Sequence, residues 1–131
     1  MRKELIIRSD PKNIKEIEHF VHVIFEHFKL DNSLYPNILI SLTEAVNNAI
    51  IHGNNADNSK CVEIRSIIKD GLLSLRISDE GQGFCLSKIP DPTEDENLEK
   101  PNGRGVFLMK NLADKIHYSK NGSVVEISFT V

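Results

Sequence analysis

The fold is decided by the stretch Cys61-Val-Glu-Ile-Arg-Ser-Ile-Ile-Lys-Asp70-Gly71-Leu-Leu-Ser-Leu-Arg-Ile-Ser78. Asp-Gly is one of the preferred pairs for a two-residue turn between antiparallel strands. The flanking residues are rich in isoleucine, valine and leucine, as is typical of strands. We therefore expect a hairpin with strands over residues 61–69 and 72–78.

Two helices are predicted before this hairpin. Residues 3–8 are expected to form a short strand, and Asp10-Pro11 then starts a helix, with Asp10 as the N-cap. Apolar residues recur from there to about Lys29 at three- and four-residue spacing, which gives one buried face. Asp31-Asn32-Ser33 supplies caps for a second helix, over about residues 33–52, which ends at Gly53-Asn54.

The C-terminal half is predicted to contain one loop, one helix and a second hairpin. Residues 85–102 are rich in proline and acidic side chains, which favours a loop. A helix over 104–113 is followed by strands at 115–119 and 123–131. This order predicts a single α+β domain over residues 1–131, a two-layer sandwich in which helices cover one face of a mixed, mainly antiparallel sheet.

Composition excludes several classes of protein. The chain has 131 residues and 40% hydrophobic content, which suits one domain with an ordinary core. Its 16 basic residues are scattered and its net charge is −3, so we expect no direct nucleic-acid binding. No segment is long and apolar enough for a membrane span or a signal peptide, so a cytoplasmic location is expected. Cys61 and Cys85 lack metal-type spacing and receive no chemical role.

The second predicted helix carries the first candidate site residues. At 100° per residue, Ser41, Glu44, Asn48 and His52 fall within an arc of about 80°, so we expect a polar edge opposite the packed face. The amide oxygen of Asn48 suits Mg²⁺, and Glu44 can accept a proton from an attacking hydroxyl. Taken alone, such a pair is more often a solvated helix edge.

Asp79 is the second candidate. It shares its parity with Leu73, Leu75 and Ile77, so its carboxylate should point to the core side of the sheet. A carboxylate in that position needs a hydrogen-bond donor, and the exocyclic amine of adenine would serve. The alternative is that Asp79 only opens a turn.

Two glycine-containing segments complete the pattern. Gly81 and Gly83 leave space for a flat ring to approach the backbone. Gly103 and Gly105 flank Arg104 at a helix start, where free amide groups can hold phosphate oxygens. Each segment is a weak signal, but together with Glu44, Asn48 and Asp79 they indicate an ATP site.

These motifs resemble those of the GHKL superfamily of ATP-binding domains. Glu44-Ala-Val-Asn-Asn48-Ala-Ile-Ile-His52-Gly-Asn is similar to the N box, Asp79-Glu-Gly-Gln-Gly83-Phe to the first glycine box, and Gly103-Arg-Gly105-Val-Phe-Leu-Met to the second. These motif sequences are most similar to those of the anti-sigma factor serine/threonine-protein kinases, and the similarity spans roughly residues 5–131. The resemblance implies the Bergerat-type ATP-binding fold.

It also implies a role for each residue. Glu44 would be the general base, Asn48 the Mg²⁺ ligand and Asp79 the partner of the adenine amine. Gly81 and Gly83 would lie beside the base and Gly103, Arg104 and Gly105 at the phosphates, with residues 85–102 as the nucleotide lid.

The function that the resemblance implies is ATP-dependent phosphorylation of a small anti-sigma factor antagonist on serine or threonine, alternating with sequestration of a sigma factor. Homodimerisation is expected from the resemblance alone. The alternative is a nucleotide-binding interaction module without kinase activity, which would not need Glu44. A detached histidine-kinase domain and a topoisomerase-like ATPase are disfavoured, since the first usually lacks this glutamate and the second normally carries a transducer domain.

Overall fold

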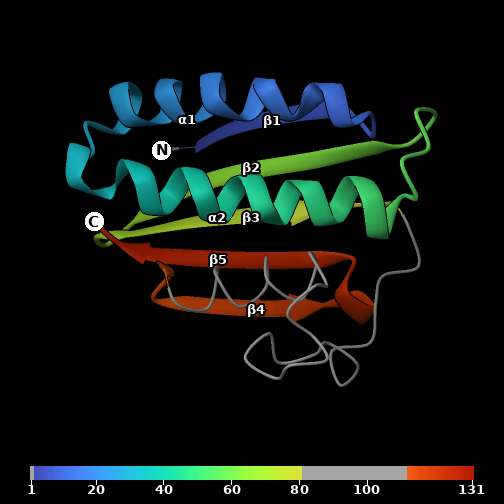
Figure 1. Ribbon diagram of the computed structural model, residues 1–131. Coiled ribbons are helices and arrows are strands. Elements are labelled where there is room, and N and C mark those ends of the chain that lie inside the picture. Colours follow the sequence, from blue (N-terminus) through green and yellow to red (C-terminus); the bar gives the residue numbers. More distant parts are fainter. Residues whose placement is uncertain (1, 81–111) are drawn as a thin grey trace, which may run out of the picture.

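The structure is a computed structural model that describes residues 2–80 and 112–131, and in this part of the chain two helices cover one face of a five-stranded sheet (Figure 1). The expected two-layer α+β arrangement is therefore confirmed. The elements are β1 Arg2–Arg8, α1 Lys15–Phe28, α2 Tyr35–Asn48, β2 Cys61–Lys69, β3 Leu72–Ser78, β4 Lys115–Ser119 and β5 Val124–Thr130.

The strands are arranged in the order β1-β2-β3-β5-β4. All four pairings are antiparallel, so in the described residues the sheet is not mixed but antiparallel throughout. β1 and β2 are antiparallel because the chain between them forms two antiparallel helices (Figure 1). The pairs β2–β3 and β4–β5 are antiparallel because a short turn joins the two strands of each pair. β5 lies between β3 and β4 and thus brings the C-terminal hairpin beside the central one.

The central hairpin has the predicted boundaries. Asp70 and Gly71 both have positive φ angles, 52° and 75°, as a two-residue turn of the type expected from Asp-Gly requires. The register from Glu63↔Ser78 to Lys69↔Leu72 places Ile64 opposite Ile77 on the helix-covered face. A one-residue slip would expose this apolar face, so the hydrophobic pattern and the turn fix the same register.

Both helical segments begin at the predicted capping residues, but the α-helices themselves start later, at Lys15 and Tyr35. The Asp10 carboxylate accepts a hydrogen bond from the Lys12 amide (3.0 Å), and the Asp31 carboxylate accepts one from the Ser33 amide (2.9 Å). Each cap starts a short 3₁₀ turn, and the α-helix follows it. α1 ends at Phe28, and Lys29 adopts the left-handed conformation with φ 54°.

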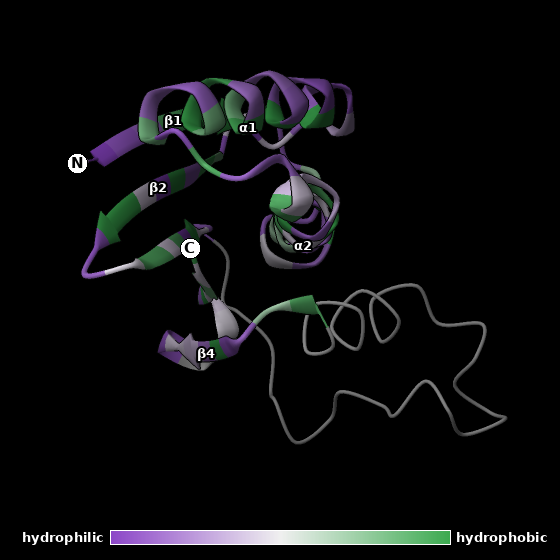
Figure 2. Ribbon diagram, turned by 90° about the vertical axis from the view of Figure 1, so that its left-hand side faces the viewer, coloured by the Kyte–Doolittle hydropathy of each residue, from purple (hydrophilic) through white to green (hydrophobic). Residues whose placement is uncertain are grey.

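The core lies between the helices and the inner face of the sheet. Figure 2 shows both helices on the same side of the sheet, and α2 lies nearer to β3 and β5 than α1 does. Ring packing joins the helices, because Phe25 and Tyr35 meet edge to face with centroids 5.1 Å apart. The fully buried large side chains come from both layers: Ile17, Val21, Ile24, Ile38, Leu42, Ile50, Ile64, Leu73, Leu75, Ile77 and Ile127.

No helix in residues 2–80 or 112–131 is long and apolar enough to cross a membrane. The predicted loop over 85–102 and residues 104–111 of the predicted third helix lie outside the described residues.

Candidate functional site

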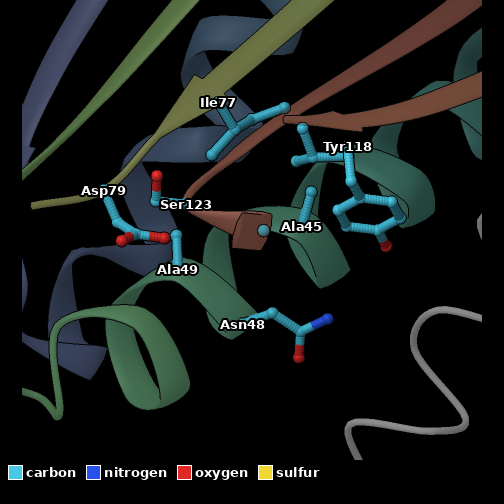
Figure 3. A pocket seen from close by; sticks show the side chains of 9 residues that line it. Ala45, Asn48, Ala49, Ile77, Asp79, Tyr118 and Ser123 are labelled. Carbon is cyan, nitrogen blue, oxygen red and sulfur yellow. The ribbon is translucent and has the colours of Figure 1, made fainter. Parts of the chain in front are cut away.

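A pocket lies between the C-terminal half of α2 and the ends of β3, β4 and β5 (Figure 3). It is small, with a cavity volume of about 10 Å³, roughly the space of one water molecule. Its walls are mostly small or aliphatic, and Asp79 and Asn48 supply polar groups. The lining residues are Ala45, Asn48, Ala49, Ile77, Asp79, Tyr118, Gly122, Ser123 and Val125.

Asp79 has the orientation that strand parity predicted. It follows Ser78, the last residue of β3, and lines the pocket together with Ile77. Its backbone amide donates a hydrogen bond to the Ser123 carbonyl (2.9 Å), which ties this end of β3 to the start of β5. In Figure 3 the carboxylate lies beside Ala49, at the opposite end of the pocket from Tyr118.

Asn48 belongs to the same pocket although it comes from a different layer. It is the last residue of α2, its side chain lines the cavity, and the residue is only 7% exposed. The structure therefore brings Asp79 and Asn48 together across one hollow, as the sequence pattern required.

The polar edge predicted for this helix is only partly correct. His52 is exposed, but Ser41 is completely buried and Asn48 nearly so. The reason is that α2 lies on the sheet with α1 along one side (Figures 1 and 2), so most of this edge is removed from solvent.

Glu44 lies one turn before Asn48 and is partly buried. Burial raises the pKa of the Glu44 carboxyl above its usual 4.5, because desolvation disfavours the charged form. Glu44 is not among the residues that line the pocket in the described part of the chain. Its position one turn before Asn48 follows from helix geometry. A carboxyl group with a raised pKa is suited to proton transfer.

Helix α2 does not end abruptly but widens into a π turn, Ala49–Gly53. The Asn54 amide donates to the Ala49 carbonyl (2.9 Å), five residues back, and the Ala56 amide donates to the Ile50 carbonyl (2.7 Å). Turns of this kind often occur at functional sites. Here the turn carries Gly53 against the Asp79 carboxylate, where an added Cβ would overlap its atoms.

Tyr118 and Ser123 are pocket residues that sequence reasoning missed. Tyr118 lies in β4 opposite Val125 of β5, and both line the cavity. Burial raises the pKa of the Tyr118 phenol to about 12. Strand parity could have placed Tyr118 on the inner face, but only the pairing of β4 with β5 brings it to Asn48.

The remaining predicted site residues, Gly81, Gly83, Gly103, Arg104 and Gly105, lie outside the described residues. A larger hollow of about 510 Å³ lies on the helix-free face of the sheet and is lined by charged and polar side chains such as Arg65, Arg76 and Glu126. Its described lining includes none of Glu44, Asn48 and Asp79.

The pocket between α2 and β3 therefore combines mostly apolar walls with two polar groups. The carboxylate of Asp79 can accept a hydrogen bond from an amine, and the carboxamide of Asn48 offers a neutral oxygen of the kind that hard cations accept.

Comparison with known proteins agrees with this geometry. Residues 7–129 match the family described as histidine kinase-like ATPase domain. Proteins named anti-sigma F factor are similar over most of their length: that of Geobacillus sp. (strain WCH70) is 40% identical over 88% of this chain and 82% of its own, and that of Bacillus cytotoxicus is 36% identical over 94% and 87%. The anti-sigma F factor of Geobacillus thermodenitrificans is 33% identical over 88% of this chain and 82% of its own. The chain therefore belongs to the histidine kinase-like ATPase domain family.

Proposed function

We propose that this protein is an ATP-dependent serine/threonine-protein kinase that acts as an anti-sigma factor. It would phosphorylate an anti-sigma factor antagonist protein and, in its other state, sequester a sigma factor. The observation that carries the proposal is that Asp79 and Asn48, 31 positions apart in the sequence, line one pocket whose other walls are mostly apolar. The names of its relatives support the choice of partners.

The nucleotide would be held from both ends of this pocket. Asp79 would accept a hydrogen bond from the exocyclic amine of adenine, while Ala45, Ala49, Ile77 and Val125 provide apolar walls for the ring. Asn48 would supply one oxygen ligand to Mg²⁺. No group of three or more His, Cys, Asp or Glu side chains in the described residues could hold a metal alone, which suits an ion bound mainly by phosphates and water.

In the transfer step, Glu44 would accept the proton of the substrate hydroxyl. The hydroxyl oxygen forms a bond to the terminal phosphorus of ATP, the bond from that phosphorus to the bridging oxygen breaks, and ADP leaves. Bound Mg²⁺ would neutralise charge on the phosphates. Gly81 and Gly83 would lie beside the base, and Gly103, Arg104 and Gly105 at the phosphates.

The test separates binding from transfer. Glu44→Ala should keep the affinity for ATP-Mg²⁺ in calorimetry and reduce phosphate transfer to the purified antagonist roughly 100- to 10,000-fold. Glu26→Ala is the matched control, because Glu26 is an exposed glutamate of the other helix, and it should leave both values unchanged.

Asp79→Asn should weaken ATP binding roughly tenfold or more, because the amide replaces one acceptor oxygen and loses the charge. Asp70→Asn, in the exposed hairpin turn, is its control, since asparagine tolerates the positive φ there. Equal ATP affinity in the wild type and Asp79→Asn would contradict the adenine assignment.

One observation favours the second candidate, a nucleotide-binding interaction module without kinase activity: Glu44 is not part of the described pocket lining. Under that alternative the wild type would bind ATP-Mg²⁺ and transfer no phosphate to the antagonist. Transfer that depends on Glu44 would exclude it.

A further inference from the structure

The chain continues past Ser78, which is both the last residue of β3 and the last residue that β3 pairs with β2. The register between these strands stops at Glu63↔Ser78, so the ladder with β2 does not reach the Glu80 amide. On the other side the Asp79 amide is tied to the Ser123 carbonyl.

The missing partner is supplied by the side chain of Asn54. This residue is completely buried, and its Oδ1 accepts a hydrogen bond from the Glu80 amide (2.8 Å). Its Nδ2 donates to the Ser9 hydroxyl (2.5 Å) and to the Cys61 carbonyl (3.1 Å). One carboxamide thus joins the chain after β1, the start of β2 and the end of β3. We call these four residues, Ser9, Asn54, Cys61 and Glu80, the strand-end clamp.

The chemistry of the strand-end clamp requires an amide at position 54. The Glu80 N–H can only donate and the Cys61 carbonyl can only accept, so the side chain between them needs one acceptor and one donor. A carboxylate would face the Cys61 carbonyl without a proton to offer. The Glu80 side chain strengthens the same junction, because its Oε2 accepts a hydrogen bond from the Cys61 amide (2.5 Å).

Gly53, the residue before Asn54, leaves the space that the Asp79 side chain occupies. An added Cβ at position 53 would overlap the carboxylate of Asp79. The carboxylate therefore occupies the space that the absent side chain leaves. Asn54 thus holds the backbone after Asp79, and Gly53 leaves room for the Asp79 side chain.

We infer that Gly53 and Asn54 are positioning residues that aim the Asp79 carboxylate and so set the selectivity of the pocket for a base that carries an exocyclic amine. This inference rests on the proposed function, because it assumes that Asp79 meets the adenine amine. Asn54 would act through Asp79, since the residues that line the pocket in the described part of the chain do not include it.

The experiment compares binding of ATP and of inosine triphosphate, which carries an oxygen in place of the amine, to the full chain with Mg²⁺. We expect the wild type to prefer ATP and Asn54→Asp to reduce that preference roughly tenfold. Gly53→Ala should reduce it as well without introducing a charge, which keeps the test informative if Asn54→Asp does not fold.

Ser66→Ala is the matched control. Ser66 is also completely buried and its hydroxyl donates to the Lys3 carbonyl (3.0 Å), but it lies in the middle of β2, away from Asp79. It should lower the melting temperature and leave the ratio of ATP to inosine triphosphate affinity at the wild-type value.

Two results would overturn the inference and they differ in meaning. If the wild type discriminates between the nucleotides and both variants keep its ratio, the inference alone fails. If the wild type binds both nucleotides equally, the adenine assignment in the proposed function fails and the inference fails with it.

Discussion

Helices α1 and α2 have the same length, 14 residues, and belong to the same layer, but they bury different chemistry. All buried residues of α1 are apolar: Ile17, Phe20, Val21, Ile24, Phe25 and Phe28. α2 buries two polar residues, Ser41 and Asn48, and partly desolvates Glu44. The difference indicates that α1 contacts the core through apolar side chains, whereas α2 also buries polar groups near the pocket. Natural proteins commonly depart from the packing rules at functional sites.

The largest effect should come from α1. Ile24→Ala removes a fully buried side chain and leaves a cavity, so we expect a loss of about 2–5 kcal/mol in the free energy of unfolding. Urea denaturation measures it. The ATP affinity of the folded protein, measured at low temperature, should not change. A loss well below 1 kcal/mol would show that α1 is not the packing helix of this comparison.

An intermediate effect of opposite sign should come from α2. The Ser41 hydroxyl is buried and has no hydrogen-bond partner in residues 2–80 and 112–131. Ser41→Ala removes this unsatisfied group and introduces a better helix former, so the free energy of unfolding should rise by about 1 kcal/mol.

The control for Ser41→Ala is His19→Ala on the exposed face of α1, which reports the gain from helix propensity alone. The comparison between the helices would break if Ser41→Ala destabilised the protein, because the hydroxyl would then contribute to folding.

The smallest effect concerns Glu44 and depends on pH. The folded protein raises the pKa of this carboxyl, so folding favours its protonated form. The resulting stabilisation is complete below about pH 4.5 and is lost as the pH rises through the raised pKa. Glu44→Gln, which stays neutral, should therefore match the wild type in stability at low pH and exceed it at neutral pH.

Thermal unfolding between about pH 4 and pH 8 would measure this difference. Glu26→Gln, at an exposed site on α1, should show no such rise. A stability gain of Glu44→Gln that grew as the pH fell would mean that Glu44 is stabilised as a carboxylate, and its raised pKa would be wrong.

Much of the fold could be predicted because its signals are local. The Asp70-Gly71 turn and the caps at Asp10 and Asp31 each involve only a few neighbouring residues. The inward direction of Asp79 also follows from local strand parity. In contrast, the burial of Ser41 and Asn48 depends on where α2 lies in the molecule, and helix periodicity cannot give that position.

The sequence by itself determined the helices, the two hairpins and the residue types that a nucleotide would need, since periodicity, capping and turn chemistry act over a few positions. Only the tertiary structure decided that β5 separates β3 from β4, that Tyr118 and Ser123 join Asn48 and Asp79, and that Asn54 ties three strands. These contacts join residues far apart in the chain. Their geometry is set by how the layers pack, because no local rule relates a helix end to the strand that it meets.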